Sequence, residues 1–302
     1  MKILIVGAGG VGGYFGAGLI KAAADITFLL REKRHRLIQE NGLTVETPEG
    51  NFTITPKSVT ADQLKPEYDL IILAPKAFDL EDSLASLEKA SANGTFLPFL
   101  NGFNHLEVLD DKFGKARVMG GVAQIAAMIT ETGAVRRMTD VQGLIAGPRS
   151  PEHETLAREF ADLCEKSSFN FVYSETIELA LWEKWVFLAT LAGMTTLCLG
   201  SVGDIVATPY GAELSQKMYS ECCAIAAANG FPINATVQSK ALSLLTKEGS
   251  IFTASMMRDL TSGQRTEHEH VLGDLIRKGT ATDTDCDLMK IAYTHMAVVK
   301  AP

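Results

Sequence analysis

The sequence predicts an α/β protein of two domains, because its two halves differ in the spacing of their apolar residues. Through residues 1–173, short apolar runs alternate with helix-compatible stretches, which is typical of a mostly parallel sheet. Beyond residue 173, long helical periodicities replace the strand signals. We therefore expect a sheet-containing domain over residues 1–173 and an all-helical domain over residues 174–302.

The first apolar run, Ile3–Val6, leads directly into the six residues Gly7, Ala8, Gly9, Gly10, Val11 and Gly12, and a helix-compatible stretch continues to Ala24. Strand, glycine-rich turn and helix in this order are typical of a Rossmann-type dinucleotide-binding domain. The first glycine permits the tight turn, the second lets the backbone approach a pyrophosphate, and the third allows close packing of helix on strand. We expect residues 7–12 to bind a dinucleotide. The alternative is a glycine-rich turn without a ligand.

The other elements follow from apolar runs and from turn signals between them. In the first domain we expect strands at 26–30, 70–74, 96–100, 117–129 and 169–173, a helix opened by Ser150-Pro151-Glu152, a hairpin over 43–55 and a second hairpin that pairs 134–138 with 143–146. In the second domain we expect helices at 176–198, 209–229, 235–247, 270–278 and 284–299, with breaks at 201–203 and 229–232.

Composition excludes several classes of partner. The 302 residues carry a net charge of −8, which argues against nucleic-acid and membrane-surface partners. The most apolar stretch, 179–199, contains 15 uncharged residues from 185 to 199, fewer than the ~20 that span a bilayer. Five scattered cysteines and the lack of signal-peptide anatomy indicate a cytoplasmic protein. The His268-Glu269-His270 run lacks metal-motif spacing, so we expect no metal. The long apolar helices leave room for a homodimer interface.

The residue at the end of the second strand predicts which dinucleotide binds. NAD-binding folds usually place an acidic residue there, about 20 residues beyond the glycines. Here the position holds Arg31, and further basic residues follow in the next helix. Guanidinium groups suit a 2′-phosphate, so we expect NADP(H) as the cofactor. Glu32, one position later, keeps NAD as an alternative.

Three polar residues occupy positions where a ligand-binding or catalytic side chain is expected. Lys76 and Asn101 each follow a predicted strand, at the sheet edge where ligands bind in α/β folds. Lys184 lies among apolar residues of a predicted helix, and burial there would lower its pKa toward the range of an acid–base catalyst. A lysine that extends to solvent or pairs with an acid is the alternative.

Taken together, these features resemble the ketopantoate reductase (2-dehydropantoate 2-reductase) family over essentially the whole chain. The shared features are the opening strand and glycine motif, Arg31, the Asn-Gly-Leu-x-Val phrase at 41–45, Lys76-Ala77, Asn101-Gly102, Lys184, Ser255-Met256 and Glu267, with twelve residues separating 255 from 267 as in the family.

The resemblance implies NADPH-dependent reduction of a 2-oxo acid to a 2-hydroxy acid, with 2-dehydropantoate reduced to (R)-pantoate in pantothenate biosynthesis as the leading case. It implies that Lys184 is the general acid and that Glu267 orients it or the substrate. Asn101 and Ser255 would hold the substrate. Residues 7–12, Arg31, Lys76, Asn101 and Glu267 would contact the cofactor.

The sequence departs from the family at four positions. The family has asparagines four, eight and eighteen residues after the lysine and three residues before the serine. This chain instead has Leu188, Ala192, Val202 and Phe252. Loss of these amides suggests a reductase of a different, more apolar 2-oxo acid on the same scaffold. A non-catalytic NADP(H)-binding sensor is a further alternative, against which the retained Lys184, Ser255 and Glu267 argue.

Overall fold

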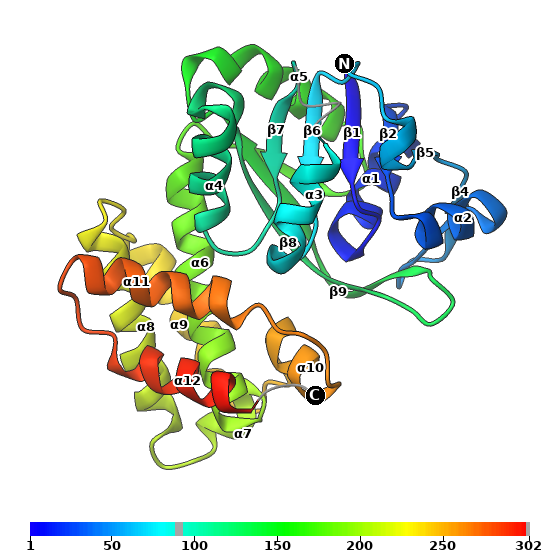
Figure 1. Cartoon of the computed structure of the whole chain (residues 1–302). Helices are drawn as coiled ribbons and strands as arrows, with labels where there is room; N and C mark the ends of the chain where they lie inside the picture. The colour runs from blue at the N-terminus through cyan, green and yellow to red at the C-terminus, as the bar shows by residue number, and fades with distance from the viewer. Residues whose placement is uncertain (88–92, 300–302) are drawn as a thin grey trace. The chain divides into compact units, whose positions relative to one another are not determined.

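The structure is a computed structural model that describes residues 1–87 and 93–299, and it divides into two compact units (Figure 1). Unit 1 takes residues 1–100 and 105–178, and unit 2 takes residues 101–104 and the chain from 179 onward. Unit 1 contains the strands, and unit 2 is helical. This confirms the α/β class with a mostly parallel sheet followed by a helical part.

A five-stranded parallel sheet forms the centre of unit 1, in the order β5-β2-β1-β6-β7. Its strands are β1 (Lys2–Val6), β2 (Asp25–Leu29), β5 (Lys57–Val59), β6 (Leu70–Leu73) and β7 (Thr95–Pro98). The four predicted strands of this sheet are confirmed. The edge strand β5 was not predicted, because its three residues Lys-Ser-Val carry no apolar run. The chain reverses direction across the sheet between β1 and β6, and ligands bind at such a position in α/β folds.

A second five-stranded sheet in unit 1 has the order β10-β9-β3-β4, with β8 paired to β9. Its strands are β3 (Leu43–Glu46), β4 (Phe52–Ile54), β8 (Gly120–Ile129), β9 (Val135–Gly147) and β10 (Asn170–Tyr173). The hairpin over 43–55 is confirmed as the antiparallel pair β3–β4.

The second predicted hairpin is wrong. Segments 134–138 and 143–146 lie along the single strand β9, which pairs antiparallel with β8. The turn lies instead at 130–133, where Gly133 has a φ of +86° that favours glycine. A register shift between Ile125 and Ala127 lets β8 stay paired on both sides of the polar residues that suggested a turn.

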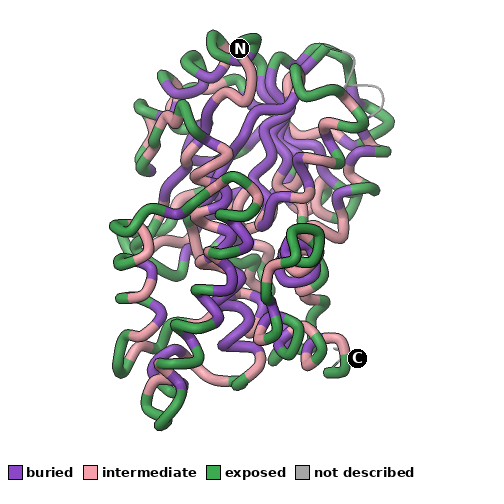
Figure 2. The backbone as a smooth tube through the Cα atoms, turned by 90° about the vertical axis from the view of Figure 1, so that its left-hand side faces the viewer, coloured by how far each residue is buried: buried purple, intermediate pink, exposed green. Residues whose placement is uncertain are grey.

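The helices of unit 1 connect the strands. They are α1 (Gly10–Lys21), α2 (Glu32–Asn41), α3 (Leu80–Ser86), α4 (Asn104–Phe113) and α5 (Glu154–Cys164). Helix α1 packs against both sheets: a Cβ on Gly16 would lie 2.7 Å from Ile5 of the parallel sheet, and one on Gly13 would lie 2.8 Å from Val135 of the other. Strands β1, β6 and β7 of the parallel sheet are almost entirely buried, and α1 is buried continuously from Gly12 to Leu19 (Figure 2).

Unit 2 consists of helices, and the five predicted helical periodicities are confirmed. The helices of this unit are α6 (Ile177–Cys198), α7 (Val202–Val206), α8 (Gly211–Ala228), α9 (Ala235–Leu245), α10 (Ser255–Thr261), the π-helix η5 (Glu269–Gly273), α11 (Asp274–Ala281) and α12 (Asp287–Val298). The short helices α7 and α10 were not predicted. Ser201, expected within a break, caps α7 by accepting a hydrogen bond from the backbone N–H of Asp204.

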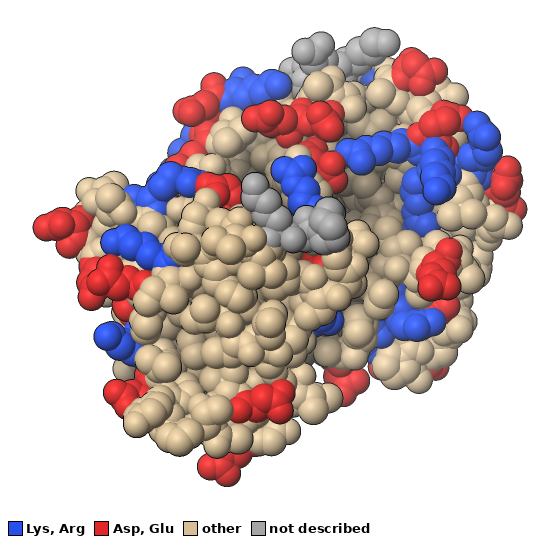
Figure 3. All heavy atoms as spheres, turned by 60° about the horizontal axis from the view of Figure 1, so that its bottom comes forward, with Lys and Arg blue, Asp and Glu red and all other residues tan. Residues whose placement is uncertain are grey.

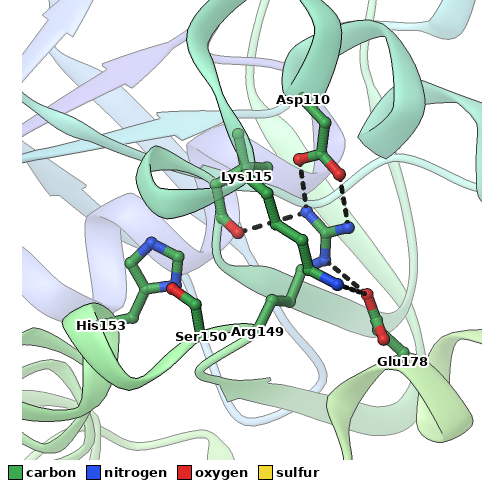
Figure 4. A network of polar contacts seen from close by, with 7 residues as sticks. Asp110, Lys115, Arg149, Ser150, His153 and Glu178 are labelled. Atoms are coloured by element: carbon green, nitrogen blue, oxygen red, sulfur yellow. Dashed lines mark hydrogen bonds and ion pairs between the residues drawn. The ribbon is translucent and has the colours of Figure 1, made fainter.

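An ion-pair network in unit 1 fixes the first turn of α6, the helix that carries Lys184 (Figure 4). The buried guanidinium of Arg149 donates two hydrogen bonds of 2.7 Å to the Asp110 carboxylate and one of 3.0 Å to Glu178. Lys115 lies 3.4 Å from the same Glu178 carboxylate. A planar guanidinium that reaches two carboxylates sets their orientation as well as their distance.

Residues 1–87 and 93–299 contain neither a membrane-spanning helix nor a cluster of metal-binding side chains. No helix there combines the length and apolarity that a membrane span requires. Within the same ranges, no group of three or more His, Cys, Asp or Glu side chains is arranged to hold a metal ion.

Candidate active site

The glycine loop between β1 and α1 has the geometry that a phosphate-binding turn requires. Gly7 adopts a φ of +93°, and a Cβ on Gly12 would lie 2.3 Å from the Gly7 carbonyl oxygen. At Gly9 a Cβ would meet nothing within 4 Å, so this side of the loop is open. No side chain caps α1 and its first turn holds no acidic residue, which leaves its N–H groups to an anion. The loop therefore fits a dinucleotide pyrophosphate.

The end of β6 adjoins this loop. A Cβ on Gly12 would lie 3.1 Å from the Cβ of Ala74, the residue that follows β6. Lys76 stands two residues further on, with an exposed side chain, at the start of the short 3₁₀ turn η2 (Ala77–Asp79). The segment that carries the predicted cofactor lysine thus leaves the sheet beside the glycine loop.

Arg31 begins α2 at the end of β2, and its exposed guanidinium already has acidic partners. It donates a hydrogen bond of 2.9 Å to Asp79 and lies 3.9 Å from Asp82. The hydrogen bond to Asp79 raises the pKa of Arg31. Glu32, the alternative contact for a ribose, is exposed and accepts a hydrogen bond of 3.2 Å from Arg36. Asp79 could not be found from the sequence, because the pair joins residues 48 positions apart.

In unit 2, three of the residues singled out from the sequence form one hydrogen-bonded group. The Lys184 ammonium donates to the Asn101 side-chain oxygen at 3.0 Å. The Asn101 side-chain nitrogen donates to a Glu267 carboxylate oxygen at 3.4 Å. Glu267 is only 7% exposed, and Lys184 is partly buried. Asn101 therefore connects an ammonium and a carboxylate through its two opposite hydrogen-bonding groups.

Burial controls the charge of the lysine. It lowers the pKa of Lys184 to about 8, while the negative charge of Glu267 opposes this change. The ammonium is thus the main form at neutral pH, but it loses its proton far more readily than an exposed lysine. A group with these properties can stabilise negative charge on an oxygen and supply a proton to it.

Two hydrogen bonds connect the segments that carry Lys184 and Glu267. The indole N–H of Trp185 donates to the carbonyl oxygen of Val271 at 2.9 Å. The N–H of Val271 in turn donates to the carbonyl oxygen of Glu267 at 2.9 Å. The residue next to the lysine is therefore tied to the turn that begins at Glu267.

The turn that carries Asn101 is held by glycine and by aromatic packing. Gly102 has a φ of +80°, and a Cβ there would lie 3.0 Å from the His270 ring. The Phe103 ring lies 5.4 Å from Trp182, 6.3 Å from Trp185 and 6.1 Å from Phe231, measured between ring centroids. Two tryptophans that flank Lys184 in the sequence were the available signal for this packing.

Ser255 is not part of the hydrogen-bonded group of Lys184, Asn101 and Glu267. It is the first residue of α10 and is partly exposed. The segment before it is tied to α7 and α6: the Phe252 carbonyl accepts from the Val202 N–H at 3.0 Å, and the Ala254 N–H donates to the Thr195 hydroxyl at 3.4 Å. The Phe252 ring lies 6.3 Å from the ring of Phe187 on α6.

Comparison with known proteins identifies the family. The models of the ketopantoate reductase PanE/ApbA family match residues 3–150 and, for the C-terminal part, residues 176–300. An uncharacterized oxidoreductase, YkpB of Bacillus subtilis, is 30% identical over 302 residues, which cover 100% of this chain and 99% of the relative.

Solved structures show the same fold. A 2-dehydropantoate 2-reductase from Geobacter metallireducens superposes with a TM-score of 0.89 at 25% identity, covering 99% of both chains. A D-mandelate dehydrogenase, solved with NADH and anilino(oxo)acetate, has a TM-score of 0.88 at 21% identity and covers 99% of this chain and 98% of its own. The chain thus belongs to the ketopantoate reductase PanE/ApbA family, and it is an oxidoreductase that acts on CH–OH groups with a nicotinamide cofactor.

Proposed function

We propose that this enzyme reduces a 2-oxo acid to a 2-hydroxy acid with NADPH, and that ketopantoate, the substrate for which the family is named, is its substrate. The observation that carries the proposal is the hydrogen-bonded group of Lys184, Asn101 and Glu267. This reaction belongs to pantothenate biosynthesis. Arg31, with its guanidinium at the end of β2, supports NADPH over NADH as the reductant.

Each residue of the group has a distinct part in the proposed reaction. Bound NADPH supplies a hydride to the ketone carbon, which places negative charge on the ketone oxygen. The Lys184 ammonium stabilises that charge and donates its proton to the oxygen. Glu267 favours the protonated lysine, and Asn101 fixes the lysine's direction through its side-chain oxygen. Ser255 and Asn101 are proposed to hold the substrate, and residues 7–12, Lys76, Asn101 and Glu267 to contact the cofactor.

A second candidate is a 2-oxo acid with a larger apolar side chain. Leu188 and Ala192 follow Lys184 at intervals of one helical turn on α6, so the three share a helix face. Val202 and Phe252, joined by a backbone hydrogen bond, replace two further amides of the family. Without the amide donors at these four positions, a substrate site discriminates less strongly between 2-oxo acids that carry a hydroxyl and those that do not.

An assay of the purified enzyme separates these candidates. NADPH oxidation is followed with ketopantoate, with branched aliphatic 2-oxo acids and with phenylglyoxylate, and each is repeated with NADH. A kcat/KM for ketopantoate at or near the highest of the panel supports the first candidate. Turnover of ketopantoate at a small fraction of the best apolar substrate supports the second. NADPH binding without turnover of any 2-oxo acid contradicts a reductase and indicates a sensor.

We also propose that the enzyme is a homodimer formed through helix α12 of the helical unit. Figure 3 shows one broad area of surface with few Lys, Arg, Asp or Glu side chains. On α12 the apolar side chains of Ile291 and Val298 are exposed, the former by 54%. Exposed apolar surface of this kind favours association. Light scattering after size-exclusion chromatography measures the mass, and a value of one chain, 32.5 kDa, would contradict the dimer.

A further inference from the structure

A second arginine of α2 contacts the glycine loop directly. The Arg34 guanidinium donates to the Ala8 carbonyl oxygen at 2.9 Å and to the Gly133 carbonyl oxygen at 2.6 Å. Ala8 belongs to the proposed phosphate-binding loop, and Gly133 belongs to the turn between β8 and β9. Unlike Arg31, which is exposed and paired with carboxylates, Arg34 joins three parts of unit 1 through backbone oxygens.

Over residues 1–87 and 93–299, no acid balances the positive charge of Arg34. Among the described residues, no carboxylate forms an ion pair with it, and its buried Nε has no hydrogen-bond partner. Burial lowers the pKa of its guanidinium, and no neighbouring charge offsets this effect. Buried charges are normally paired, since their desolvation is unfavourable without a partner. A charge left in this state beside the glycine loop favours an anion nearby.

The contact also fixes the direction of a peptide group. The Ala8 carbonyl and the Gly9 N–H belong to one planar unit, and in a trans peptide the two point in opposite directions. Arg34 on the carbonyl side therefore turns the Gly9 N–H toward the other side of the loop. A cation that binds the carbonyl also polarises the peptide and strengthens the N–H as a donor.

We propose that Arg34 is a positioning residue for the cofactor pyrophosphate, which it serves by orienting the Ala8–Gly9 peptide and by adding positive charge to that subsite. The inference rests on the proposed dinucleotide site. It assigns different parts of the cofactor to two arginines of one helix: Arg31 acts on the 2′-phosphate, which only NADPH has, and Arg34 acts on the pyrophosphate, which NADPH and NADH share.

Calorimetric titration of the purified enzyme with NADPH, NADH and ADP-ribose tests this assignment. Arg34→Gln should raise all three Kd values by a similar factor, about tenfold, which corresponds to about 1.4 kcal/mol. Arg31→Gln should raise the Kd of NADPH alone. Arg36→Gln, the matched control on the same helix, removes an exposed arginine paired only with Glu32 at 3.2 Å and should leave every Kd within about twofold.

Two further measurements separate a charge effect from a loosened loop. The dependence of the Kd of NADH on salt concentration should become shallower in Arg34→Gln, which damage to the loop alone would not cause. Arg34→Lys keeps the charge, so it should retain the wild-type salt dependence. Arg34→Met, which is also neutral, serves in place of Arg34→Gln if that variant does not fold. Wild-type affinity for NADH and ADP-ribose in Arg34→Gln, or wild-type salt dependence, would overturn the assignment. If the wild-type protein itself bound none of the three ligands, the proposed function would fail instead.

Discussion

At the scale of single residues, the charge state of Lys184 depends on two opposing influences. Burial lowers its pKa to about 8, and the negative charge of Glu267 acts in the other direction. Asn101 links the two side chains by hydrogen bonds of 3.0 and 3.4 Å. The lysine therefore stays charged at neutral pH while its proton is easier to transfer than that of an exposed lysine.

Replacement of the lysine should remove catalysis and leave the cofactor site intact. We expect Lys184→Ala to lower kcat about 10²- to 10⁴-fold, the range for loss of a general acid, because no described neighbour offers a second ammonium at Asn101. The Kd of NADPH, measured by titration, should change by less than about twofold. Lys240→Ala, which removes an exposed lysine of α9, is the control and should keep wild-type kcat. Wild-type turnover in Lys184→Ala would remove Lys184 from the mechanism.

The rate of reduction should fall at alkaline pH. A general acid works only when protonated, and the pKa of Lys184 is about 8. At saturating NADPH, kcat/KM for the 2-oxo acid should be constant below this pH and decline about tenfold per pH unit above it. The residual rate of Lys184→Ala should lack this decline. A profile that stays flat up to pH 10 would contradict the assignment.

The native carboxylate of Asp79 should oppose the binding of NADPH. Its carboxylate holds the Arg31 guanidinium at 2.9 Å and places a negative charge where a 2′-phosphate is proposed to bind. Since exposed ion pairs contribute up to about 1 kcal/mol, we expect Asp79→Asn to lower the Kd of NADPH about two- to fivefold and to leave that of NADH unchanged. Glu81→Gln removes a nearby exposed charge that has no role in this pair and is the control. A weaker affinity for NADPH in Asp79→Asn would show that the carboxylate orients Arg31 productively.

The residues found from the sequence and those missed differ in the kind of contact they make. Gly7, Gly9 and Gly12 act through local backbone geometry, so their spacing between a predicted strand and a predicted helix identified the loop. Lys184 and Asn101 were singled out by their positions and given roles by resemblance, but their direct hydrogen bond joins positions 83 residues apart and has no local signal. Asp79 and the burial of Arg34 depend in the same way on packing between distant segments.

At the scale of elements, a hydrogen bond from Trp185 joins the middle of helix α6 to the segment that carries Val271, and a comparison of two tryptophans tests it. Trp182 and Trp185 are each 1% exposed and lie one turn apart. The Trp185 indole donates to the Val271 carbonyl at 2.9 Å, while the buried Trp182 indole nitrogen has no partner among the described residues. The two differ in hydrogen bonding far more than in burial.

Replacement of each tryptophan by phenylalanine isolates that hydrogen bond. Trp185→Phe leaves the Val271 carbonyl without its donor and should lower the free energy of unfolding by about 1–3 kcal/mol more than Trp182→Phe does. It should also lower kcat, because Val271 and Glu267 share the same turn. Denaturant titration and steady-state kinetics measure the two effects. Equal losses of stability in both variants would show that burial alone determines the contribution of these residues.

The elements that the sequence predicted poorly are short or depend on pairing. Helix α7 has five residues and begins at a serine that also suits a turn, so periodicity could not reveal it. Strand β9 crosses a polar stretch near Asp140 that looked like a turn, and its pairing with β8, β3 and β10 on either side of that stretch keeps it extended. The long helices and the buried parallel strands were predicted well because burial alone determines their patterns.

At the scale of the whole molecule, the proposed dimer depends on the exposed apolar face of helix α12. Ile291→Glu places a charge on the exposed face of α12 and should give a protein of one-chain mass in light scattering, because an unpaired carboxylate in an apolar interface is unfavourable. Val172→Glu is the matched control, since Val172 is equally exposed, at 54%, but lies on strand β10 of unit 1. A dimer that survives Ile291→Glu would place the interface elsewhere.

Four residues of the first half of the chain, 101–104, fold with the helices of the second half. Asn101 contacts Lys184 there, and Phe103 packs among the tryptophans of α6. A fragment that starts at residue 179 would thus lack Asn101 of the hydrogen-bonded group and the Phe103 ring of the hydrophobic core. Exchange of C-terminal halves between family members would join each helical half to a foreign 101–104 turn, so chimeras that aim to transfer substrate preference need to carry this turn along with the helices.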